Sequence, residues 1–106
     1  MFVRIVAMQL KPNTGQEFTQ VFESQIIPTL RKQPGFTDEM LLVDPDGPEV
    51  VAISLWDSKQ NAETYSRTTY PEVLKTLAKV IERTPQVRTF EVAHSTFHKM
   101  ATHAAA

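Results

Sequence analysis

Cysteine is absent from this chain and glycine is scarce, with only three among 106 residues. Without cysteine the protein can form no disulfide framework, no thiolate metal site and no cysteine nucleophile. Gly15, Gly35 and Gly47 each fall at an expected turn or helix end, so no glycine-rich loop is left to cradle a phosphate. Nicotinamide and flavin fingerprints are also missing, and the sequence predicts neither a cofactor nor a metal ion.

An excess of charge of one sign is lacking too, because 11 lysines and arginines stand against 12 aspartates and glutamates. A dedicated nucleic-acid-binding protein would carry a basic surplus. Arg4 and Gln9 interrupt the apolar N-terminal run, and no window approaches the roughly 18 apolar residues of a membrane-spanning helix. We therefore expect a cytoplasmic protein with neither nucleic-acid nor membrane partners.

The spacing of apolar residues predicts alternating strands and helices. We expect strands over residues 2–10, 36–43, 50–56 and 87–97, and helices over about 15–32, 59–66 and 71–82. Thr14 and Glu17 fit a capping box at the start of the first helix, and Pro28 predicts a kink near its end. Ser58 is placed to cap the second helical segment, which we expect to bend at Thr68–Tyr70.

The resulting order is β-α-β-β-α-β, which is typical of a ferredoxin-like α+β fold. Such a fold has one antiparallel four-stranded sheet with helices on one face. Residues 36–43 and 50–56 flank a turn-forming segment and predict a hairpin. We expect a single domain over residues 1–100, followed by a flexible tail at 101–106.

Alternation along the strands predicts a sheet that is apolar on both faces. The first strand is expected to place Phe2, Val6, Met8 and Leu10 on one face and Val3, Ile5 and Ala7 on the other. The second is expected to place Phe36, Met40 and Leu42 opposite Leu41 and Val43, and the third Val51, Ile53 and Leu55 opposite Val50, Ala52 and Trp56. Helices can cover only one face, and a soluble monomer tolerates only a few hundred Å² of apolar patch. We therefore predict a homodimer with sheets packed face to face, the alternative being side-chain shielding at the edge of the sheet.

Several short motifs resemble those of the antibiotic biosynthesis monooxygenase domain, over about residues 2–98. The motifs are Gly15 with Phe18, Val21 and Phe22, then Gln33-Pro34-Gly35-Phe36, then Ile53-Ser54-Leu55-Trp56-Asp57-Ser58, and Ala62. The resemblance implies a dimeric α+β barrel and, among other activities, cofactor-independent oxidation of polycyclic phenols to quinones. Other members of that family degrade haem, isomerise or bind small metabolites.

Two functional patterns of the family are not matched. The quinone-forming type carries an asparagine four residues before the strand-ending tryptophan, where this chain has Ala52. The haem-degrading type needs asparagine, tryptophan and histidine near the positions of Ala7, Tyr65 and Lys75. The resemblance therefore implies the fold more firmly than any one reaction, and haem degradation is disfavoured.

Four residues are candidates for binding a substrate. Trp56 ends the third strand and its ring suits a flat aromatic ligand, although it could equally plug the junction of strand and helix. Tyr65 and Tyr70 flank the expected bend and could hydrogen-bond a polar ligand group, or could be core residues with a wet tip. Arg67 is placed to anchor an anionic group, or is solvated.

His94 is the predicted general base, because histidine titrates near neutral pH. A partly buried structural histidine is the alternative. His98 lies four residues further along the expected strand, about 13 Å away at the rise of a strand, so the two histidines cannot share a metal ion.

These residues favour a small cofactor-independent monooxygenase acting on an aromatic or polyketide-type molecule, whose own enolate or phenolate reduces O₂. The alternative is a non-oxygenase protein of the same fold, such as a small-molecule binder, an isomerase or a stress-related protein. An RNA-binding module is disfavoured because residues 50–56 lack the basic and stacking side chains that such a sheet needs.

Overall fold

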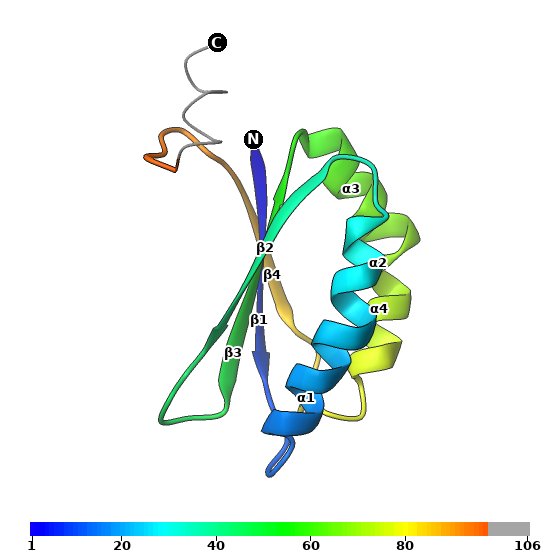
Figure 1. Ribbon diagram of the computed structural model, residues 1–106, viewed down its shortest axis with the longest axis vertical. Coiled ribbons are helices and arrows are strands. Elements are labelled where there is room, and N and C mark those ends of the chain that lie inside the picture. Colours follow the sequence, from blue (N-terminus) through cyan, green and yellow to red (C-terminus); the bar gives the residue numbers. More distant parts are fainter. Residues whose placement is uncertain (98–106) are drawn as a thin grey trace.

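The computed structural model describes residues 1–97, so His98 and the predicted tail at 101–106 lie outside the described residues. Four strands form one antiparallel sheet in the order β2-β3-β1-β4. They are β1 (Phe2–Gln9), β2 (Phe36–Val43), β3 (Glu49–Trp56) and β4 (Gln86–Glu91). All helices lie on one face of this sheet (Figure 1). The predicted ferredoxin-like α+β fold and the β2–β3 hairpin are confirmed. No helix in the described part of the chain is long and apolar enough to cross a membrane.

The first helical segment is interrupted by a π-helical turn. It runs as α1 (Gly15–Val21), η1 (Phe22–Ile26) and α2 (Ile27–Arg31). Pro28 has no N–H to donate to the preceding turn, and the wider π turn next to it accommodates that loss. The predicted capping box is wrong, because the Thr14 hydroxyl donates to the carbonyls of Lys11 and Val80 instead of capping α1.

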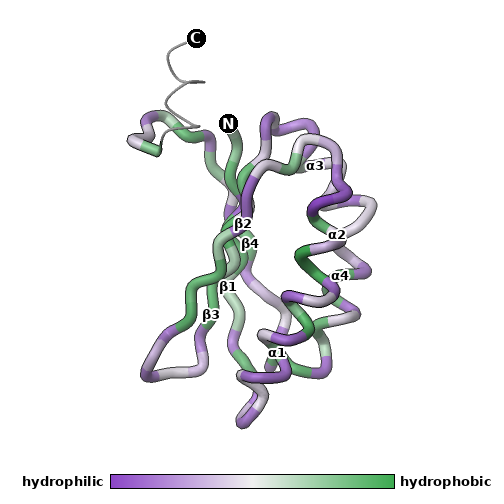
Figure 2. Tube along the Cα trace, viewed as in Figure 1, coloured by the Kyte–Doolittle hydropathy of each residue, from purple (hydrophilic) through white to green (hydrophobic). Residues whose placement is uncertain are grey.

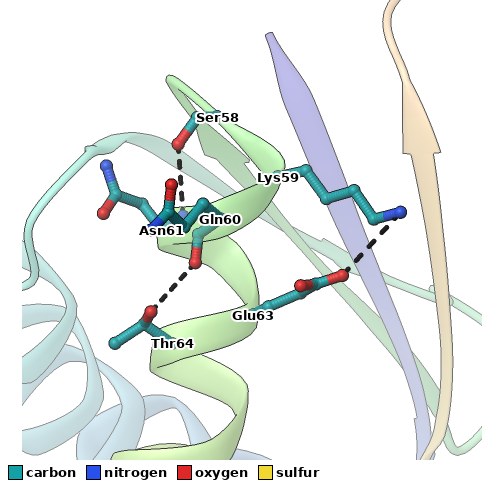
Figure 3. Close-up of polar contacts among 6 residues, drawn as sticks. All are labelled: Ser58, Lys59, Gln60, Asn61, Glu63 and Thr64. Carbon is teal, nitrogen blue, oxygen red and sulfur yellow. Dashed lines mark hydrogen bonds and ion pairs between the residues drawn. The ribbon is translucent and has the colours of Figure 1, made fainter.

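The second helical segment begins at Ser58, whose hydroxyl oxygen accepts the backbone N–H of Asn61 at 3.2 Å (Figure 3). It bends at Thr69 as predicted, between α3 (Lys59–Thr68) and α4 (Tyr70–Leu77). The second part, α4, ends at Leu77, five residues before the predicted end at residue 82. The chain after Leu77 turns because Ile81 forms a bridge with Leu10.

The helix-facing side of the sheet is the hydrophobic core. Burial alternates along β1, with Phe2, Arg4, Val6 and Met8 buried and the residues between them only partly buried. The predicted alternation is confirmed along β1 and over residues 49–53 of β3, whereas the last three residues of β3 are all buried. Hydrophobic stretches run along the central strands in Figure 2.

The predicted face of Phe36 is wrong. A register shift at Thr37 brings Phe36 opposite Trp56 and Asp38 opposite Leu55. This bulge moves Phe36 to the helix side, where its ring packs edge-on against Trp56. Met40 and Leu42 stay on the outer face.

The last strand is shorter than predicted and ends at Glu91. Glu91 pairs with Phe2, the first residue of β1, so β1 offers no partner strand beyond that point. The N–H of Val92 donates to the carbonyl of Met1 and the chain then leaves the sheet. His94 therefore lies in a loop, on the solvent-exposed surface, and not on a strand.

The outer face of the sheet is uncovered within a single chain. Met40, Leu42 and Phe90 are each at least 40% exposed there. Ile5 pairs with Ile53 near the middle of this face, and both are only partly buried. The face thus keeps the apolar character that the sequence predicts.

Gly35 offers a test of this fold, because it has a φ of 80° and sits against α3. A Cβ at this position would overlap the side chains of Asn61 and Asp57, which are hydrogen-bonded to each other at 2.8 Å. We expect Gly35→Ala to lower the free energy of unfolding by roughly 1–3 kcal/mol in urea denaturation. Gly15→Ala is the matched control, because no atom lies within 4 Å of its added Cβ, and it should be neutral or slightly stabilising. Equal stability of both variants would contradict the described turn.

Candidate functional site

A cavity lies between the helix-facing side of the sheet and the helices. It encloses about 390 Å³ of space between atoms, including its open mouth, of which about 30 Å³ is wide enough for the centre of a water molecule. Most of the lining is apolar and comes from Val6, Met8, Phe22, Ile26, Leu30, Ala52, Val73 and Leu77. The polar part of the lining is Arg4, Glu39, Ser54, Tyr65 and Tyr70. A mostly apolar hollow with a few convergent polar groups is typical of a small-molecule site.

Three of the polar residues form a row across the sheet. Arg4 of β1 and Glu39 of β2 both pair with Ser54 of β3, so Ser54 stands between them. Directly opposed side chains on neighbouring strands start about 4.5–5.5 Å apart at Cβ. The register therefore places a cation and a carboxyl on either side of one hydroxyl.

Arg4 is buried, with 3% of its surface exposed, yet no salt bridge pairs it within residues 1–97. Its guanidinium carbon lies 4.4 Å from the ring centroid of Tyr70 and 5.1 Å from that of Tyr65. Cation–π contacts of this kind offset part of the cost of burying the charge. Burial raises the pKa of both phenols, and the positive charge of Arg4 opposes that rise.

Three buried polar atoms around the cavity have no hydrogen-bond partner. They are Arg4 Nη2, Glu39 Oε1 and the Tyr70 hydroxyl. Buried polar groups are nearly always hydrogen-bonded in folded proteins, so a ligand or a water molecule in the cavity would supply the missing partners. Arg4 is close enough to the Tyr70 hydroxyl to lower the pKa of that phenol, although the contact does not meet the geometry of a hydrogen bond. The set offers a donor from the guanidinium, a carboxyl, and a phenol able to do either.

Glu39 is the titrating group of this set. Desolvation by burial raises its pKa to about 8, and the charge of Arg4 opposes the rise without cancelling it. A carboxyl with such a pKa can take up or release a proton near neutral pH, as a general acid–base group must.

Trp56 lies behind the cavity and does not line it. It is fully buried, and its ring centroid is 5.0 Å from that of Tyr65 and 5.7 Å from that of Phe36. Its indole N–H donates to the Ser54 hydroxyl oxygen at 2.9 Å. Trp56 therefore supports two lining residues, Tyr65 and Ser54, from outside.

The structure brings together three of the five residues predicted from the sequence. Tyr65 and Tyr70 lie with their ring centroids 6.1 Å apart, and the Trp56 ring packs against Tyr65 at an interplanar angle of 31°. Arg67 and His94 are exposed and do not line the cavity. Their functional roles remain predictions.

Arg4 and Glu39 line the cavity but are not among the candidates predicted from the sequence, although the sequence carries a signal for each. Strict alternation places Arg4 on the same face as Phe2 and Val6, which is the buried one. Glu39 shares a face of β2 with Leu41. The register shift at Thr37 is needed to see that this face is the one turned toward the helices. Within residues 1–97, no three acidic, histidine or cysteine side chains are grouped to hold a metal ion.

Comparison with known proteins places the chain in a family. The model of the antibiotic biosynthesis monooxygenase family matches residues 1–77, so this chain is a member of that family. The resemblance drawn from the sequence motifs is thereby confirmed. A search of curated proteins finds no sequence match.

Several solved structures share the fold at low sequence identity. A cofactor-independent oxygenase, SnoaB from Streptomyces nogalater, is 17% identical with a TM-score of 0.76, over 92% of this chain and 97% of that one. A monooxygenase from the gene ActVA-Orf6 of Streptomyces coelicolor, in complex with nanaomycin D, is 19% identical with a TM-score of 0.75, over 91% and 90%. A protein from Nitrosomonas europaea described as a putative antibiotic biosynthesis monooxygenase is 19% identical with a TM-score of 0.73, over 89% and 100%.

The raised pKa of Glu39 predicts a pH-dependent stability. Between about pH 4.5 and pH 8 the folded protein keeps a proton on Glu39 that the unfolded chain has released. The free energy of unfolding should therefore fall as the pH rises through this window and level off above it. Urea denaturation at several pH values should show a shallower fall for Glu39→Gln. The exposed Glu49 provides the control, and Glu49→Gln should keep the wild-type slope; identical slopes in all three proteins would contradict the prediction.

Proposed function

We propose that this protein is a cofactor-independent monooxygenase that acts on a planar aromatic or polyketide-type molecule bound in the cavity. The observation that carries the proposal is that Glu39 and the buried Arg4 flank Ser54 in the sheet, each with an unpaired atom in an apolar hollow. The printed descriptions of two structural relatives, a cofactor-independent oxygenase and a monooxygenase holding nanaomycin D, support the same class.

The first step of the proposed reaction is removal of a proton from the substrate. The Glu39 carboxylate takes a proton from an acidic CH₂ group next to a conjugated carbonyl, or from the hydroxyl of its enol. The electron pair left behind forms an enolate, and Arg4 Nη2 donates to its oxygen. A donor already fixed in a water-poor site stabilises developing negative charge more than it would in water.

The remaining steps use O₂ as the oxidant. The enolate carbon gives electrons to O₂ and forms a C–O bond, and protonation yields a hydroperoxide. Loss of the second proton from that carbon forms C=O as the O–O bond breaks, and the departing hydroxide is protonated to water. The balance is CH₂ plus O₂ to C=O plus H₂O, so the substrate itself supplies all the electrons.

The narrowness of the cavity restricts how a substrate can enter. Only about 30 Å³ admits the centre of a water molecule, so a flat ring system needs a lining side chain to move. Tyr70 is the best placed to do so, because it is only partly buried and sits at the start of α4, next to the bend. Its movement would open the site and then exclude water from the bound substrate.

A second candidate function is isomerisation without O₂. It is favoured by Ala52, which lines the cavity where the quinone-forming type of the family carries asparagine. Glu39 and Arg4 suffice for this reaction, because enolisation only removes a proton and returns it at another atom. Exchange of substrate hydrogen for deuterium in D₂O without O₂ consumption would support this alternative.

The central test is Glu39→Gln, which keeps the size of the side chain but removes the base. With an anthrone-type substrate and an oxygen electrode, we expect the variant to lose about 10²–10⁴-fold in kcat. Wild-type kcat/KM should rise with pH and reach a plateau above about pH 8, the pKa of the Glu39 carboxyl.

His94→Ala is the variant that separates the two possible bases. The structure places His94 outside the cavity of its own chain, so its replacement should leave turnover within about twofold if Glu39 is the base. A large loss in His94→Ala with full activity in Glu39→Gln would contradict the proposal and support the histidine.

We also propose that two chains pack their outer sheet faces together as a homodimer. The support is the uncovered apolar face, with Ile5 and Ile53 paired at its middle. Light scattering should give twice the chain mass for the wild type. Ile5→Lys should shift the protein towards monomer or insoluble material, because a lysine there would be buried without a partner. Gln20→Lys, on the exposed side of α1, should remain dimeric, and a soluble wild-type monomer would contradict this interface.

A further inference from the structure

The hydrogen bond between Trp56 and Ser54 controls which way the Ser54 hydroxyl can donate. The indole N–H donates to the Ser54 oxygen at 2.9 Å, and both residues are buried. A hydroxyl has one proton and two acceptor positions. Because the indole occupies an acceptor position, the Ser54 proton remains available for another group.

The position of Ser54 indicates where that proton can be used. Ser54 lines the cavity and stands between Arg4 and Glu39 in the sheet, while Trp56 lies outside the lining. Arg4 Nη2 is an unpaired donor next to it. Both donors and the Glu39 carboxyl therefore line the same cavity, in one row across the sheet.

We propose that Ser54 is a specificity-determining residue, which donates together with Arg4 to a single oxygen of a planar ketone or its enolate. Trp56 is then a positioning residue that acts through Ser54 and does not touch the ligand. This inference rests on the proposed function, because it concerns the same site. It adds which ligands the site selects, namely those with an acceptor oxygen conjugated with a flat ring system.

The buried position of Trp56 rules out direct stacking of its ring on a ligand in the cavity. An indole that stacked directly on the substrate would need an exposed ring face, yet Trp56 is fully buried under Tyr65 and Phe36. Two donors on one oxygen also discriminate strongly, because a ligand that lacks the oxygen leaves buried donors unpaired.

The test uses two probes of the same shape, 1-tetralone, which has a carbonyl oxygen, and tetralin, which lacks it. Binding is measured by calorimetry under nitrogen, so no turnover is needed. We expect Ser54→Ala to weaken 1-tetralone about 3- to 10-fold and to leave tetralin within about twofold. Trp56→Phe, which keeps a ring but removes the N–H, should weaken only 1-tetralone, and by less.

A spectroscopic readout distinguishes donation to the ligand from support of the fold. Loss of a hydrogen bond should raise the infrared C=O stretching frequency of bound 1-tetralone in Ser54→Ala. Ser54→Thr, which keeps a hydroxyl, should restore both the frequency and the affinity. Urea denaturation and circular dichroism of each variant identify any that fails to fold. If Ser54→Ala fails to fold, the wild type is compared with Ser54→Thr instead.

Three results would overturn the inference. They are equal weakening of both probes by Ser54→Ala, an unchanged C=O frequency, and no binding of 1-tetralone to the wild type at millimolar concentration. The proposed monooxygenase reaction fails separately: if Ser54 controls ketone binding but no ketone supports O₂ consumption, the reaction is wrong and the binding site stands. If Glu39→Gln abolishes turnover while Ser54→Ala binds 1-tetralone normally, only this inference is wrong.

Discussion

The burial of the Arg4 guanidinium is the constraint on which the rest of the site depends. An arginine with 3% exposure is costly unless its charge and its N–H groups find partners. The rings of Tyr65 and Tyr70, which come from α3 and α4 on either side of the bend, supply the attraction. The positive charge of Arg4 does not cancel the effect of burial on Glu39, whose pKa stays raised at about 8. The site therefore combines a permanent cation with a carboxyl that can exchange a proton near neutral pH.

Sheet register converts this constraint into geometry. Hydrogen bonds between neighbouring strands fix their register, so the pairing of Ser54 with both Arg4 and Glu39 holds the three residues in one row. Helices contribute mainly the apolar walls, through residues such as Ile26, Leu30 and Leu77. The sheet therefore carries Arg4, Glu39 and Ser54, while the helices add the two tyrosines to their apolar walls.

The order of elements, the hairpin and the alternation of β1 and β3 follow from local patterns, and the sequence is sufficient to predict them. The errors arise where tertiary contacts override the local pattern. β4 stops at Glu91 because its partner strand begins at Phe2, and Phe36 changes face because a bulge at Thr37 shifts the register. In the site, Tyr65, Tyr70 and Trp56 are close in the chain, and the sequence is sufficient to single out all three as candidates. Arg4 and Glu39 come from separate strands, and only the strand order brings them together.

The π turn at Phe22–Ile26 has a consequence for how the chain could tolerate a change in length. A π turn holds one residue more than the α-helical turn it replaces, and in an α-helix each residue advances the side chains by about 100°. Phe22 and Ile26 come from this turn and Leu30 follows it, and all three face the cavity. Removing one residue from the turn would rotate Leu30 away from the site relative to Phe18, and it would also leave Pro28 inside a regular α-helix. The lining of the cavity and the accommodation of Pro28 therefore depend on the same extra residue.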